Sequence, residues 1–144
     1  MAAMRSSSDL APHTKAYATG RFAETLFRAL SARQARRWNF VSFRGAGGGE
    51  SRGIVDVVAI RRDMSPPSRP PLRSGDLFDI ILVQVKGGAA PRPTADDIAR
   101  LKSVAKHYRA KSVVLYAWRN GVSSQFFKLH RGDWQVTTAA EVFG

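Results

Sequence analysis

Two apolar stretches, Ile54–Ile60 (IVDVVAI) and Leu77–Lys86 (LFDIILVQVK), decide the fold that this sequence predicts. Each stretch has the length of a strand and is apolar on both faces over most of that length, which is typical of a central strand covered on both sides. The segment between them, Asp63–Asp76, contains four prolines together with Ser and Arg, so we expect a mobile basic loop there. The two stretches therefore predict neighbouring strands at the centre of a sheet.

The flanking segments extend this pair into an alternation of helices and strands. Gly20–Arg37 repeats apolar residues at helical spacing, and Trp38–Arg44 alternates as a strand does. Thr94 followed by Asp97 resembles a capping box that opens a second helix, and further strands are expected from Lys111 onward. The order predicts an α/β fold, with a mixed central β-sheet flanked by helices.

Length and composition limit the classes of protein to consider. The chain has 144 residues, which fits one domain at 18–144 preceded by a flexible tail at 1–17. It has no cysteine, which excludes disulfides and thiolate metal sites and fits a cytoplasmic protein. No apolar run approaches the roughly 20 residues of a membrane-spanning helix, so we expect no membrane partner.

The charge indicates a polyanionic partner. Lys and Arg number 23 against 11 Asp and Glu, which gives a formal net charge of +12. Basic groups that neutralise phosphates release counterions and so bind nucleic acid regardless of its sequence. DNA or RNA is the partner that this surface favours, and the alternative is a solvated basic surface without a partner.

Polar residues interrupt both central stretches. Asp56 lies in the first, and Gln84 and Lys86 share one face of the second because side chains alternate along a strand. If the two strands pair as a hairpin, Asp56 and Lys86 lie at the same end of it. A carboxylate, an amide oxygen and an ammonium group meeting there suit Mg²⁺-assisted hydrolysis of a phosphodiester. The alternative is that Asp56 caps a turn or pairs with an arginine, and that Lys86 marks the point where a strand surfaces.

Three short motifs resemble the PD-(D/E)xK nuclease superfamily, and within it archaeal Holliday-junction resolvases and Mrr-type restriction endonucleases. They are Gly20-x-x-x-Glu24, Gly53–Ala59 (GIVDVVA) and Val83–Lys86 (VQVK). The resemblance covers roughly residues 18–117 and implies a restriction-endonuclease-like αβββαβ core, with extra C-terminal strands outside it.

The resemblance also implies a role for each matching residue. Asp56 would be the essential metal ligand, Lys86 the catalytic lysine, and Glu24 a helix-borne acid that reaches the metal. Gln84 stands where an acid is usual and is similar to the Mrr-type variant, so it would be a ligand with one negative charge fewer. The expected metal is Mg²⁺, or Mn²⁺ in its place. A homodimer is implied as well, since a four-way junction needs two symmetric cuts.

Four basic residues are candidates for contact with DNA phosphates. Arg44 and Arg52 flank the glycines of the expected loop at 45–53, where the backbone could approach a phosphate closely. Lys102 and Lys106 lie one turn apart on the second helix, where they form either phosphate contacts or a solvated face.

The sequence therefore predicts a metal-dependent endonuclease that hydrolyses DNA, with branched or otherwise structured DNA as its substrate. One alternative is a catalytically decayed nuclease-like module that binds nucleic acid without cutting it. Another is a basic interaction protein with no role on nucleic acid.

Overall fold

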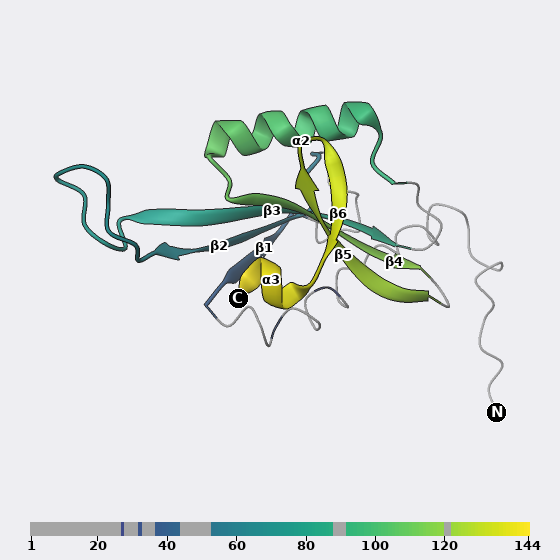
Figure 1. Ribbon diagram of the computed structural model, residues 1–144, viewed down its shortest axis with the longest axis horizontal. Helices are drawn as coiled ribbons and strands as arrows, with labels where there is room; N and C mark the ends of the chain where they lie inside the picture. The colour runs from purple at the N-terminus through teal and green to yellow at the C-terminus, as the bar shows by residue number, and fades with distance from the viewer. Residues whose placement is uncertain (1–26, 28–31, 33–36, 44–52, 88–91, 120–121) are drawn as a thin grey trace.

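The computed structural model describes residues 27, 32, 37–43, 53–87, 92–119 and 122–144 (Figure 1). Its elements, in chain order, are β1 (Asn39–Ser42), β2 (Val57–Asp63), β3 (Leu77–Gly87), α2 (Ala95–Tyr108), β4 (Ser112–Arg119), β5 (Val122–His130), β6 (Asp133–Thr137) and α3 (Ala139–Phe143). Most of the predicted first helix, the tail at 1–17 and the loop at 45–53 lie outside the described residues. Among the described residues, none belongs to a helix both long and apolar enough to cross a bilayer.

The six strands form one mixed sheet in the order β1-β2-β3-β4-β5-β6. Neighbouring strands are antiparallel except β3 and β4, which are parallel. Parallel neighbours need a crossover connection, and α2 supplies it between them. The α/β architecture with a mixed central sheet confirms the predicted fold class.

The two central stretches pair as the predicted hairpin. Val57 lies opposite Val83, and the register continues to Asp63 opposite Leu77. β2 begins three residues later than the sequence predicts, so Asp56 precedes the strand instead of lying within it. The backbone of Asp56 still joins both neighbours, since its N–H donates to the Val83 carbonyl at 3.0 Å and its carbonyl accepts from the Phe43 N–H at 3.0 Å.

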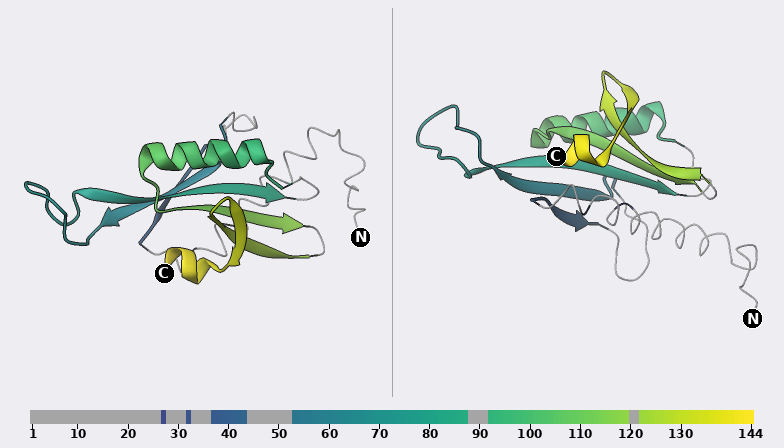
Figure 2. Two further views of the ribbon diagram at one scale, coloured as in Figure 1. Left: turned by 45° about the horizontal axis from the view of Figure 1, so that its top comes forward. Right: turned by 60° about the horizontal axis from the view of Figure 1, so that its bottom comes forward.

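The sheet is covered on both faces (Figure 2). On one face, α2 buries Leu101 against Leu82 and Val113. The larger core lies on the opposite face, where aromatic side chains meet the inward residues of β2 to β5. Its buried members are Phe27, Trp38, Val57, Ala59, Ile81, Val83, Val85, Val114, Tyr116, Phe126 and Phe143.

Helix α2 begins at the capping box that the sequence predicts. The Thr94 hydroxyl accepts from the Asp97 N–H at 3.2 Å, and the Asp97 carboxylate accepts from the Thr94 N–H at 2.9 Å. This backbone hydrogen bond is the main cause that lowers the pKa of Asp97. The helix ends at Arg109, which takes the left-handed conformation at φ 53°.

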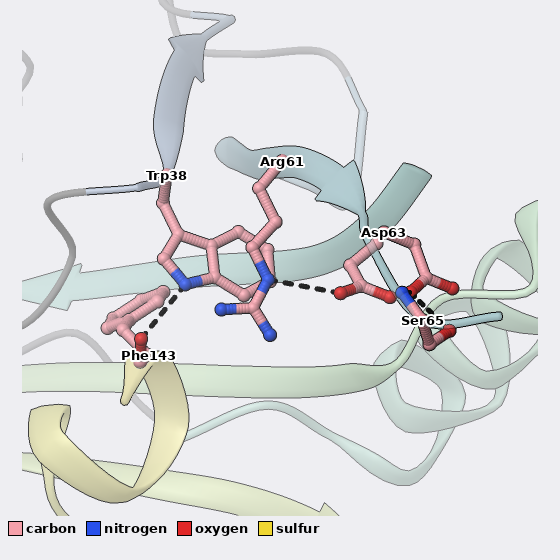
Figure 3. Close-up of polar contacts among 6 residues, drawn as sticks. Trp38, Arg61, Asp63, Ser65 and Phe143 are labelled. Atoms are coloured by element: carbon pink, nitrogen blue, oxygen red, sulfur yellow. Dashed lines mark hydrogen bonds and ion pairs between the residues drawn. The ribbon is translucent and has the colours of Figure 1, made fainter. Parts of the chain in front are cut away.

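The sequence analysis missed the short helix α3, which closes the larger core. The indole N–H of Trp38 donates to the Phe143 carbonyl at 3.0 Å (Figure 3). The Arg61 guanidinium lies 4.3 Å from the centre of the Trp38 ring and pairs with Asp79 at 3.0 Å. These contacts tie the C-terminus to β1, β2 and β3.

Candidate active site

Asp56 is fixed at the beginning of β2 by a neighbouring strand. Its Oδ2 accepts a hydrogen bond from the Val85 N–H on β3 at 2.8 Å, and its side chain is half-buried. If the β2–β3 register is extended by one residue, Asp56 lies opposite Gln84. The carboxylate therefore lies beside the segment that carries the other two candidate residues, as the sequence predicts.

Gln84 is the one buried polar or charged residue among the described residues, at 4% exposure. Its Oε1 atom accepts no hydrogen bond from any residue that the structure describes. A buried carbonyl oxygen without a partner costs free energy, because it has lost its water and gained nothing in return. Such an atom is explained by a functional role, a ligand or an ordered water, and the Trp134 indole N–H is a second buried polar group without a partner among the described residues.

Lys86 lies two residues further along β3 and is half-buried, so it projects from the same face as Gln84. The start of α2 is close to it, since the positive charge of Lys86 contributes to lowering the pKa of Asp97, after the larger effect of the Thr94 hydrogen bond. No ion pair involving Lys86 is found in the described part of the chain. Its ammonium group is therefore available to a ligand bound at the end of the hairpin.

A further basic residue, Arg92, lies on this face and was not among the predicted site residues. Gln84 lies opposite Leu115 on β4, which lies opposite Phe127 on β5. The Arg92 guanidinium lies 4.4 Å from the centre of the Phe127 ring, so it covers the same row of side chains. Arg92 directly precedes Pro93 and Thr94 at the start of α2, and this position was its only sequence signal.

The donor atoms at this end of the hairpin fit a hard divalent cation. Asp56 offers a carboxylate, and Gln84 offers a carbonyl oxygen that no described residue satisfies. No group of three or more His, Cys, Asp and Glu side chains that could hold a metal occurs within the described ranges. A cation here would thus have few protein ligands, as is usual for Mg²⁺, which keeps several waters.

Three predicted site residues, Glu24, Arg44 and Arg52, lie outside the described residues. The roles assigned to them remain predictions.

Lys102 and Lys106 lie on α2, away from the hairpin end. Both are exposed, and Lys106 is nine residues beyond Asp97, which is about 13 Å along the helix. They line a groove of about 440 Å³ together with Arg131 in the β5–β6 turn. The structure places these two lysines in one basic groove, and their contact with DNA phosphates stays a prediction.

Comparisons with known proteins support the fold. No protein-family model matches the chain, and no curated protein matches it. Among solved structures, the chain is similar to Hjc of Archaeoglobus fulgidus, a Holliday junction resolvase from an archaeal hyperthermophile. The TM-score is 0.52 at 16% sequence identity, and the alignment covers 87% of this chain and 100% of Hjc. At this identity the likeness shows the fold, which is the predicted restriction-endonuclease-like α/β fold.

Proposed function

We propose that this protein is a metal-dependent endonuclease that hydrolyses phosphodiester bonds in structured DNA. The observation that carries this proposal is the buried Gln84 Oε1, which has no described partner and lies beside the fixed carboxylate of Asp56. A residue placed there only to stabilise the sheet would be apolar or satisfied. The likeness to a Holliday junction resolvase supports the nuclease class.

Each residue at the hairpin end has a distinct role in the proposed site. Asp56 and Gln84 would hold Mg²⁺ or Mn²⁺, with Glu24 as a further acidic ligand. When bound, the metal would polarise the phosphoryl oxygen and lower the pKa of a water. Lys86 would orient that water or stabilise the negative charge that develops on the phosphate. Arg92 would hold the DNA backbone beside the site, because its guanidinium lies on the same face.

DNA is the proposed partner because the surface is strongly basic. A homodimer belongs to the proposal too, since two symmetric cuts resolve a four-way junction. The second candidate function is a nuclease-like module that binds DNA without cutting it. Gln84 favours that alternative, because an amide carries no charge and holds a cation less strongly than a carboxylate does.

A cleavage assay tests the proposal. The protein is incubated with linear, branched and single-stranded DNA in Mg²⁺, in Mn²⁺ and in excess chelator, beside the Asp56→Asn variant. Asparagine retains an oxygen that accepts the Val85 N–H, so the fold is preserved while the negative charge is removed. We expect cleavage only with metal and only by the unchanged protein, and branched DNA to be cut fastest. Salt-dependent binding without metal-dependent cleavage would establish the second candidate instead.

A further inference from the structure

The opposite end of the β2–β3 hairpin projects beyond the sheet as an arm, residues 61–79. β1 pairs with β2 only as far as Ile60, and β4 pairs with β3 only from Ile81. Beyond these positions the two strands pair only with each other, from Arg61 opposite Asp79 to Asp63 opposite Leu77. Figures 1 and 2 show this ribbon and its connecting loop extending away from the body.

The arm is held in a defined shape by hydrogen bonds. The Gly75 N–H donates to the Asp63 carbonyl at 2.9 Å, and the Arg62 guanidinium donates to the Gly75 carbonyl at 2.8 Å. The N–H groups of Ser65 and Arg73 are also paired, with carboxylates of the arm. As predicted, no helix or strand forms between 64 and 76. These contacts close the loop against the end of β2, and its expected mobility stays a prediction.

Each acid of the arm is engaged by the protein itself. Asp63 accepts from the Ser65 hydroxyl at 2.6 Å, which is the main cause that lowers the pKa of Asp63. Asp76 accepts from the Arg73 N–H at 2.7 Å, and Asp79 pairs with Arg61 at 3.0 Å. Every carboxylate of the arm therefore has a hydrogen-bond or ion-pair partner within the arm.

Four exposed basic residues lie on the arm or beside its base, and together we call them the arm surface: Arg37, Arg69, Arg73 and Lys111. In the described ranges, none of their side chains forms a hydrogen bond or ion pair. Arg37 and Lys111 line a hollow of about 790 Å³ at the base of the arm, and the two other arginines are carried by its loop. Asp63 and Asp79 line the same hollow, and the charge of Lys111 contributes to lowering the pKa of Asp63, after the larger effect of the Ser65 hydrogen bonds, so the base of the arm carries both signs of charge while its loop carries Arg69 and Arg73.

We propose that the arm surface binds the phosphate backbone of duplex DNA, at a distance from the candidate active site. This inference rests on the proposed function, since it takes DNA as the ligand. Seven residues of extended chain separate Asp56 from Asp63, on the order of 20 Å. That length corresponds to about six base pairs at 3.4 Å each. The hollow is lined by Arg61, Asp63 and Asp79, which alternation places on the opposite face of the hairpin from Gln84 and Lys86, so the arm would contact a part of the DNA other than the phosphate that reaches Lys86.

Two features favour DNA over an acidic protein as the ligand. The projection is a two-stranded ribbon, which is narrow enough to enter the major groove of a duplex. The basic residues of the arm surface are also spread from beside the base of the arm to its loop, as contacts to successive phosphates require. The formal charge of +12 for the whole chain acts in the same direction.

The test measures binding of a labelled duplex by the full chain as a function of salt, between about 50 and 200 mM. The variant is Arg69→Ala with Arg73→Ala. The control, Arg100→Ala with Lys128→Ala, removes the same two charges from exposed positions outside the arm. We expect the arm variant to bind about tenfold more weakly and its salt dependence to lose about two phosphate contacts.

The outcomes separate this inference from the proposed function. Equal binding losses in the two double variants would overturn the role of the arm and leave only an effect of net charge. Unchanged binding in the arm variant, with cleavage intact, would reject the arm surface while the nuclease stands. If the unchanged protein binds no duplex at low salt but captures an acidic protein through the arm, the inference fails together with DNA as its ligand.

Discussion

The two ends of the β2–β3 hairpin carry similar polar residues, but these residues differ in the partners that the fold gives them. At the arm end, Asp79 pairs with Arg61, and Arg61 also stacks on Trp38. At the other end, the buried Gln84 Oε1 has no partner among the described residues, and Lys86 forms no ion pair there. At the arm end the carboxylates are bound within the protein, and at the other end the Asp56 carboxylate and the Gln84 oxygen form the proposed cation site. The unsatisfied oxygen supports the candidate site only together with its neighbours Asp56 and Lys86, because the Trp134 indole N–H also has no partner among the described residues.

The largest expected effect comes from replacing a lysine by alanine, in separate variants, at each of the two ends. Lys86→Ala should lower the cleavage rate by roughly 10² to 10⁴, because a group that acts on the water or on the developing charge is lost. The affinity of the Lys86→Ala variant for DNA should change little. Lys111→Ala should do the reverse, with binding weakened and the cleavage rate at saturation retained. Single-turnover cleavage and salt titrations of binding measure the two effects, and a common response of both variants would remove the distinction between the ends.

Substitutions on β3 should change stability in opposite directions at the two ends. Gln84→Met removes an unsatisfied buried oxygen, so we expect the free energy of unfolding to rise by about 1 kcal/mol while metal binding weakens. Asp79→Leu leaves the Arg61 guanidinium without its carboxylate, so we expect a loss of about 1 kcal/mol. Urea denaturation without metal gives both values. Destabilisation by Gln84→Met would mean that the amide has a structural partner.

The smallest effect concerns the start of α2, beside Lys86. Thr94→Ala should lower the free energy of unfolding by about 1 kcal/mol, because it removes the side chain that caps the helix. The Asp97 carboxylate of the same box has a pKa lowered from its ordinary 3.8. Its stabilisation is present above that value and is lost as the pH falls through the lowered pKa. Asp97→Asn should therefore be less stable than the unchanged protein at neutral pH, and the gap should close in acid.

Much of the fold followed from local sequence patterns. Alternation and apolar runs predicted the strands, and the proline-rich segment between two of them predicted their hairpin. The start of β2 could not be placed, because Ile54 and Val55 are as apolar as a strand yet pack against the α2 side of the sheet. Helix α3 has only five residues, too few for a helical period to be visible.

The candidate site was predictable where it depended on register alone. Period-two alternation and antiparallel pairing placed Gln84 and Lys86 near Asp56. Contacts between residues that are far apart in the sequence produce no such pattern in the sequence. Arg92 over Phe127 and Arg61 over Trp38 each join residues from separate elements, and nothing in their local sequence specifies the partner.

We propose that the carboxylate of Asp56 at one end of the hairpin, and not that of Asp79 at the other, supports DNA cleavage. Asp56→Asn and Asp79→Asn remove the same charge from the two ends, so their cleavage rates in Mg²⁺ under saturating protein test it most directly. We expect Asp56→Asn to lose metal-dependent cleavage while it binds DNA normally, and Asp79→Asn to cut at nearly the original rate. Equal cleavage by the two variants would contradict it.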